Sequence, residues 1–143
     1  CIWLSRLILL ASSINIKLFC KGQSSSIDRV MSQAEYSQIY RQSRMAVNFS
    51  QRVMTDVRII TGRVWETLAC GCLLFEQEND EIEQFFTPFI HYIPFETWDE
   101  LQFFIQYFSE NSSLRERIST AGSNHYRRYF GPNSYWNLVS LLS

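Results

Sequence analysis

The sequence lacks any dense run of positive charge. Its 13 lysine and arginine residues stand against 14 acidic residues, for a net charge of −1. Nucleic acid is thereby excluded as a main partner, because phosphate backbones are bound mainly by clustered basic side chains. A transmembrane helix requires about 20 apolar residues. The apolar start, residues 1–13, is shorter, is interrupted by Arg6 and has no charged leader. We therefore expect the end of a helix at a fragment boundary rather than a signal peptide.

The four cysteines form no metal-binding or redox pattern. Cys1, Cys20, Cys70 and Cys72 include no CxxC pair, and no histidine lies near them in the sequence. This spacing disfavours zinc. Buried free thiols in a reducing compartment are the expected alternative. We therefore expect a cytoplasmic protein, with peripheral attachment of the full-length protein to a membrane left open.

Several signature motifs are also missing. The sequence contains neither the P-loop pattern GxxxxGK[ST] nor the dinucleotide pattern GxGxxG. A phosphorylatable receiver domain needs acidic residues at strand ends, whereas the strands expected here end at Cys20, Ser50 and Phe75. Neither His91 nor His125 has a plausible nucleophile close in sequence, so Ser-His-Asp and Cys-His catalysis are unsupported.

What is present is the composition and pattern of one globular α/β domain. Of the 143 residues, 46% are apolar and 15% are aromatic, enough for a substantial core. We expect strands at residues 14–20, 45–49, 72–75 and 92–95, and helices ending at residue 11 and over residues 32–43, 61–70, about 79–86, 97–110, 113–131 and 132–142. Alternating strands and helices predict a Rossmann-like three-layer sandwich around a parallel sheet.

Ligands of open α/β sheets bind at the carboxyl ends of the strands, against helix starts. Three such edges are predicted. The first carries Lys21, in the loop after the strand at residues 14–20, and the third is the acidic segment 76–80. The second leads from Ser50 to the helix that Thr61 is expected to cap. It is the most informative of the three.

At this second edge, free backbone N–H groups of Gly62, Arg63 and Val64 would form an anion site. Gly62 allows a ligand to come close, and the Arg63 guanidinium suits a phosphate. Glu66 lies three residues further on the same helix face, where its carboxylate could accept two hydrogen bonds from vicinal hydroxyls, as in ribose. The competing interpretation, favoured by spacing alone, is an exposed Arg–Glu pair on a surface helix.

Residues 62–74, GRVWETLACGCLL, resemble the R-x-x-E-x-x-A-x-G core of group 1 glycosyltransferases, closest to their spore-maturation-type branch. The acidic segment 76–86, the following HYIPF at 91–95 and LRERISTAG at 114–122 fit the same family. The resemblance implies the GT-B fold, in which two Rossmann-like domains face each other across a cleft. It implies that residues 1–143 are one nucleotide-sugar-binding domain, the C-terminal half, without the N-terminal acceptor domain and without its own first strand.

The resemblance also implies roles for individual residues. Glu66 would bind the donor ribose, and the helix start at Thr61, Gly62 and Arg63 would lie near the diphosphate. Many group 1 enzymes carry another glutamate eight positions earlier, which contacts the sugar, and here Arg58 occupies that position. Whether sugar transfer retains or inverts configuration therefore stays open.

The expected function is transfer of a sugar, of hexosyltransferase type, from a UDP- or GDP-sugar to a glycan, protein or lipid acceptor. No metal cofactor is expected, because no Asp-x-Asp motif is present to hold one and the helix start with basic side chains would neutralise the diphosphate. This chain alone is expected to be inactive, since the acceptor wall would belong to the other half. The alternative is a non-catalytic nucleotide-sensing or interaction module on the same fold.

Overall fold

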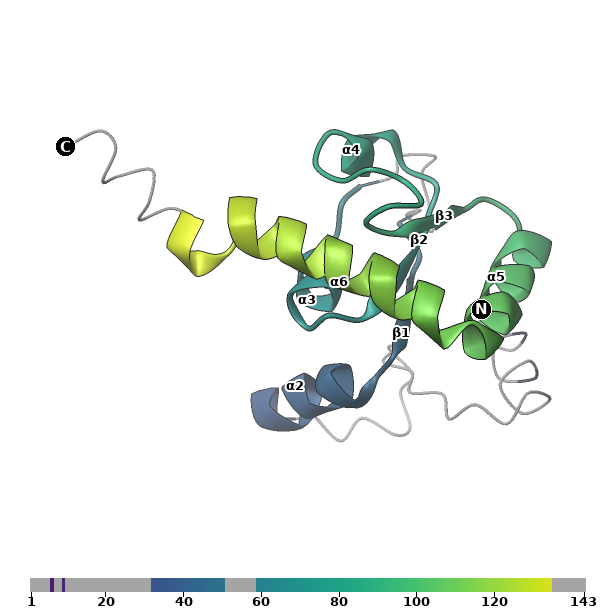
Figure 1. Cartoon of the computed structure of the whole chain (residues 1–143), viewed down its shortest axis with the longest axis horizontal. Coiled ribbons are helices and arrows are strands. Elements are labelled where there is room, and N and C mark those ends of the chain that lie inside the picture. The colour runs from purple at the N-terminus through teal and green to yellow at the C-terminus, as the bar shows by residue number, and fades with distance from the viewer. Residues whose placement is uncertain (1–5, 7–8, 10–31, 51–58, 135–143) are drawn as a thin grey trace.

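The computed structural model describes Arg6, Leu9 and residues 32–50 and 59–134 (Figure 1). The elements in chain order are α2 (Gln33–Gln42), β1 (Met45–Asn48), α3 (Gly62–Ala69), β2 (Leu73–Gln77), α4 (Asp80–Glu83), β3 (Ile93–Phe95), α5 (Trp98–Glu110) and α6 (Ser112–Tyr129). The predicted strand at residues 14–20 lies outside the described residues, as do the helix ending at residue 11 and most of the helix at 132–142.

The three described strands form one parallel sheet in the order β1-β2-β3. Met45 pairs with Leu73, and Phe75 pairs with Ile93. Each strand is joined to the next through a helix, α3 in the first connection and α4 in the second. Alternating elements thus produce the parallel sheet that the sequence predicts, because parallel neighbours require a crossover connection.

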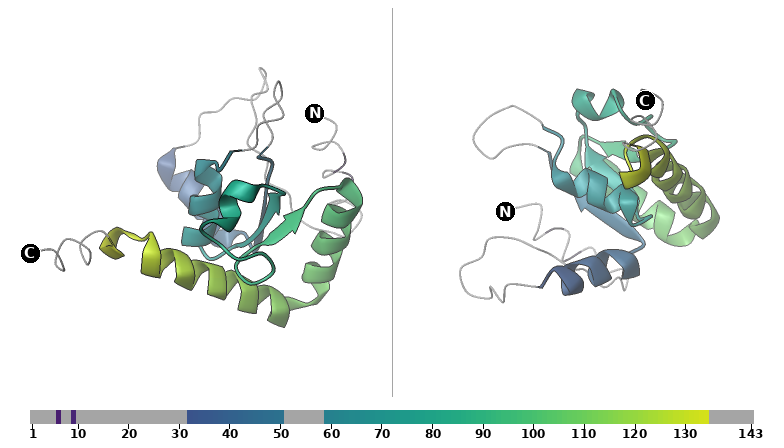
Figure 2. Two further views of the ribbon diagram at one scale, coloured as in Figure 1. Left: turned by 90° about the horizontal axis from the view of Figure 1, so that it is seen from above. Right: turned by 90° about the vertical axis from the view of Figure 1, so that its left-hand side faces the viewer.

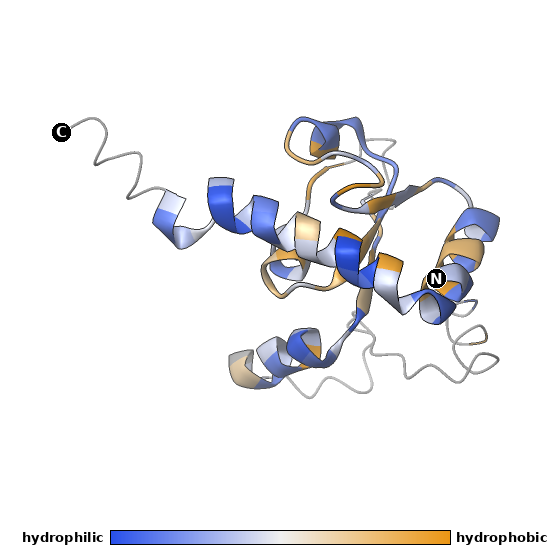
Figure 3. Ribbon diagram, viewed as in Figure 1, coloured by the Kyte–Doolittle hydropathy of each residue, from blue (hydrophilic) through white to orange (hydrophobic). Residues whose placement is uncertain are grey.

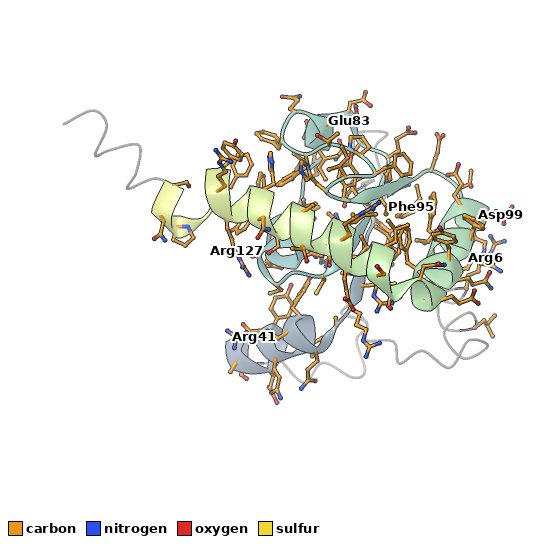
Figure 4. All side chains as sticks on the ribbon, viewed as in Figure 1. Arg6, Arg41, Glu83, Phe95, Asp99 and Arg127 are labelled. Atoms are coloured by element: carbon orange, nitrogen blue, oxygen red, sulfur yellow. The ribbon has the colours of Figure 1, made fainter. Side chains whose placement is uncertain are left out.

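Apolar side chains cover both faces of this sheet. Successive side chains of β2 point to opposite faces, so they belong to two different apolar clusters. Leu73 and Phe75 belong to the layer shared with α5, which Phe95 also enters (Figure 4). Leu74 faces the other way and packs with α3. Helix α6 runs from the end of α5 across the molecule and past the sheet (Figures 1 and 2), and its residues join both layers. The predicted Rossmann-like three-layer fold is confirmed. Figure 3 shows apolar residues along the strands of the sheet and in the loop between α4 and β3.

Helix starts follow the sequence signals to different degrees. Thr97 and Glu100 form a capping box at the start of α5, as expected for a threonine followed three residues later by a glutamate. Thr61 occupies the N-cap position of α3, but its side chain makes no capping hydrogen bond, and its buried hydroxyl oxygen has no partner among the described residues. The predicted N-cap position of Thr61 is therefore confirmed, but the side-chain hydrogen bond expected of a cap is not formed. Gly71 ends α3 with a φ of 75°, as predicted, because glycine tolerates that conformation.

The ends of several elements differ from prediction, and one difference matters for the site. Strand β2 was expected to end at Phe75 but continues to Gln77, because Glu76 pairs with Asn48 of β1 on one side and Pro94 of β3 on the other. Pairing on both sides extends a strand beyond its apolar run. Glu76 is therefore inside the sheet and not in the loop after it.

Candidate functional site

The carboxyl ends of β1 and β2 lie side by side. Hydrogen bonds join the segment that follows β1 to the end of β2 and to α4. The Ser50 hydroxyl donates to the Gln77 carbonyl oxygen over 3.2 Å. The Ile60 amide donates to the Glu81 carboxylate over 3.3 Å. Helix α3 therefore begins at this edge, as the parallel arrangement requires.

The start of α3 is open to solvent. Gly62 and Arg63 are exposed, and a Cβ atom built on Gly62 would meet no atom of the described residues within 4 Å. The Val64 amide already donates to the Thr61 carbonyl oxygen over 3.1 Å, so the expectation that this amide is free for an anion is wrong. The N–H groups of Gly62 and Arg63 have no acceptor within the described residues, as expected for a helix N-terminus.

Arg63 and Glu66 are both exposed on α3, but they do not pair with each other. Arg63 makes no ion pair with any residue that the structure describes, so the expected alternative of a surface Arg–Glu bridge is absent there. Glu66 instead accepts a hydrogen bond from the Tyr36 hydroxyl of α2, with 2.5 Å between that oxygen and Oε2. The carboxylate thus has a defined position at the surface.

Tyr36 is a residue that the sequence analysis did not assign to the site. Burial, followed by the hydrogen bond to Glu66, raises the pKa of the Tyr36 hydroxyl, which keeps its proton at any physiological pH. The available signal was the spacing of Tyr36 and Tyr40, which places two phenols one turn apart on α2. That spacing does not reveal the partner, because Glu66 lies 30 residues further along the chain.

A second polar pair is buried at the ends of the strands. The Asn48 side-chain amide donates to Glu76 Oε2 over 2.8 Å, and the two residues are 2% and 0% exposed. Burial raises the pKa of Glu76 to about 8, although the Asn48 hydrogen bond acts in the opposite direction. Asn48 Oδ1 and Glu76 Oε1 have no hydrogen-bond partner in the part of the chain that the structure describes. Sequence reasoning missed this pair because it placed Glu76 after the strand.

Both histidines and Cys72 contribute to packing. The His91 ring accepts from the Thr87 amide and lies 4.3 Å from the His125 ring, which donates to the Phe85 carbonyl oxygen. The Cys72 thiol is buried and donates to the carbonyl oxygens of Tyr40 and Ser43.

Cys70, in contrast, is exposed, so the expectation of a buried thiol is wrong at that position. Cys1 and Cys20 lie outside the described residues, as do the two further candidate donor contacts Lys21 and Arg58. Within the described ranges no three histidine, cysteine or acidic side chains gather closely enough to hold a metal ion. Of the helices described, none has the length and apolarity needed to cross a membrane.

The parallel sheet, its flanking helices and the polar groups at its carboxyl edge define a Rossmann-like α/β domain, the class that binds ligands at this edge. The sequence model of the family described as Glycosyl transferase-like matches residues 4–137. This chain belongs to that glycosyl transferase-like family, so the glycosyltransferase-type domain predicted from the resemblance is confirmed. Among curated proteins, none matches the chain.

Proposed function

We propose that this chain is the donor-binding domain of a glycosyltransferase that takes its sugar from a nucleoside diphosphate. Membership of the family supports glycosyl transfer in general. The observation that carries the proposal is the exposed Glu66 carboxylate, held on the helix that begins at the carboxyl edge of the sheet. A nucleoside diphosphate sugar offers vicinal ribose hydroxyls to a carboxylate and two phosphates to a helix N-terminus.

The diphosphate would lie at the start of α3. The Gly62 and Arg63 amides supply two donors at the positive end of the helix dipole, and the absence of a Cβ on Gly62 lets a phosphate approach the backbone. The exposed Arg63 guanidinium is an additional fork-shaped donor. As the bond to the sugar breaks, these groups would stabilise the negative charge on the leaving diphosphate.

The ribose would bind Glu66. An ionised carboxylate offers about four acceptor positions on its two oxygens, so the bond from Tyr36 to Oε2 leaves room for two ribose hydroxyls. The acceptor site and the opposite wall of the cleft would come from a second domain, as in the two-domain group 1 enzymes that the sequence resembles. Transfer depends on holding donor and acceptor together, so we expect nucleotide binding without sugar transfer by residues 1–143 alone.

The test is isothermal titration of the chain with UDP and GDP. Binding of either nucleotide is expected, and its identity names the base. Glu66→Ala should weaken that binding by about 1.5–3 kcal/mol, typical of a lost hydrogen bond to a charged group. Glu116→Ala, on the exposed side of α6, is the matched control and should leave affinity unchanged. Absence of binding to both nucleotides, or equal affinity of Glu66→Ala and the wild type, would overturn the proposal.

A further inference from the structure

Helices α2 and α3 meet through a short hydrogen bond between two side chains. The Tyr36 hydroxyl lies 2.5 Å from Glu66 Oε2, at the short end of the range for a hydroxyl donating to a carboxylate. Glutamate has three rotatable side-chain bonds, and an exposed carboxylate on α3 would otherwise sample many positions. The Tyr36 phenol removes that freedom, because its rigid ring reaches the carboxylate from a different helix.

Tyr36 is itself oriented by a second phenol. The Tyr36 and Tyr40 rings pack edge to face with centroids 5.1 Å apart, and their hydroxyl oxygens are separated by 3.3 Å. Tyr36 has one hydroxyl proton, and the shorter, charge-assisted bond to Glu66 takes it. The proton between the two phenols is therefore that of Tyr40. Tyr40 therefore donates a hydrogen bond to Tyr36, and Tyr36 donates one to Glu66.

The helix that carries these phenols is fixed to the end of α3. The Cys72 thiol, two residues beyond the C-cap of α3, lies 3.0 Å from the Tyr40 carbonyl oxygen and 3.1 Å from that of Ser43. At its other end, α2 is closed by a capping box of Ser32 and Glu35. The Cys72 contacts therefore fix the C-terminal end of α2, which carries Tyr40, without involving Glu66.

We propose that Tyr36 is a positioning residue, which holds the Glu66 carboxylate in the orientation that accepts the two ribose hydroxyls of the donor, and that Tyr40 supports it. The inference rests on the proposed function, because it assigns Tyr36 a role only through the ribose contact of Glu66. Preorganisation of this kind strengthens binding by reducing the freedom lost when the ligand arrives. Its effect is confined to ligands that use the carboxylate, so it should depend on the ribose hydroxyls.

The experiment is titration of the chain with the ribonucleoside diphosphate that the wild type binds, UDP or GDP, and with its 2′-deoxy analogue. Tyr36→Phe keeps the ring and removes the hydroxyl. It should weaken ribonucleotide binding by about fivefold, the size of one hydrogen bond. Binding of the deoxy analogue should change less, so discrimination between the two nucleotides should fall. Tyr107→Phe, which removes an exposed hydroxyl on α5, should change neither affinity.

A double-mutant cycle separates positioning from stability. In a Glu66→Ala background, Tyr36→Phe should have no further effect on affinity, because the carboxylate that it positions is gone. If Tyr36→Phe does not fold, as judged by its circular dichroism, Tyr40→Phe is titrated in its place. A smaller loss with the same dependence on the ribose hydroxyl is then expected.

The outcomes distinguish the inference from the function on which it rests. Equal losses for the ribose and deoxyribose ligands, or an undiminished effect in the Glu66→Ala background, would show that the phenol only stabilises the fold and would overturn the positioning role. Unchanged affinity of Tyr36→Phe, in a wild type that binds UDP or GDP, would overturn the inference and leave the proposed function standing. A wild type that binds neither nucleotide would overturn both.

Discussion

Asn48 and Glu76 face each other on adjacent parallel strands and share a buried hydrogen bond of 2.8 Å between Nδ2 and Oε2. Both lie at the carboxyl ends of their strands, the edge to which the ligand site is assigned. A carboxyl group in this position is more stable neutral than ionised, because burial removes the hydration of the charge. The sheet therefore contains an acid that stays protonated near pH 7, with a pKa of about 8.

The first prediction concerns stability against pH. The folded-state pKa of Glu76 is raised from 4.5 to about 8, so between these values the folded protein holds a proton that the unfolded chain releases. The resulting stabilisation is fully present below pH 4.5 and declines as pH rises to about 8, by up to roughly 1.4 kcal/mol per pH unit. Urea unfolding between pH 5 and pH 9 measures this decline.

Glu76→Gln provides the comparison, because it keeps the shape of the side chain and cannot ionise. The free energy of unfolding of the variant should not show the fall with rising pH that the Glu76 carboxyl causes. Above pH 8 it should exceed that of the wild type. Parallel curves for the two proteins across the whole range would contradict the raised pKa.

The second prediction concerns Arg63. Because its guanidinium is assigned to the phosphates, Arg63→Ala should weaken nucleoside diphosphate binding by roughly tenfold or more, as for a hydrogen bond to a charged group. Binding of the bare nucleoside should stay within about twofold, measured by competition. Arg127→Ala on α6 (Figure 4) is the matched control for loss of one exposed arginine. Equal losses for diphosphate and nucleoside would remove Arg63 from the phosphate site.

The third prediction is that nucleotide binding needs no divalent metal. The α3 N-terminus and Arg63 are expected to neutralise the diphosphate, which is the role that a metal ion plays in other transferases. Titrations in EDTA and in Mn²⁺ should therefore give the same affinity for UDP or GDP. Binding that disappears in EDTA and returns with Mn²⁺ would refute this prediction.

The fourth prediction concerns the packing of α6 against the segment before β3. A Cβ atom on Gly122 would overlap the His91 carbonyl oxygen and come within 2.9 Å of Leu68 Cδ2. Gly122→Ala should therefore destabilise the protein by about 1–3 kcal/mol, despite the better helix propensity of alanine. Asn124→Ala, exposed on the same helix, should be neutral or slightly stabilising. Thermal unfolding compares them, and equal midpoints would mean that α6 moves to accept the methyl group.

Local patterns in the sequence determine most of the architecture. The alternation of apolar runs with helical periodicity determines a parallel α/β sheet, and Thr97 with Glu100 determines where α5 begins. Arg63 and Glu66 can be assigned to one helix face from their spacing alone. These features depend on neighbours within one or two turns of a helix or a few residues of a strand, so the sequence is sufficient to predict them.

Contacts between distant segments required the tertiary structure. Glu76 extends β2 only because Asn48 and Pro94 pair with it from both sides. The partner of Glu66 is Tyr36 of another helix. The spacing in the sequence favoured Arg63, which lies on the same helix as Glu66. Both outcomes depend on which elements the fold places together. A hydrogen bond forms where burial and geometry bring two groups within about 3 Å, and sequence distance carries little information about that separation.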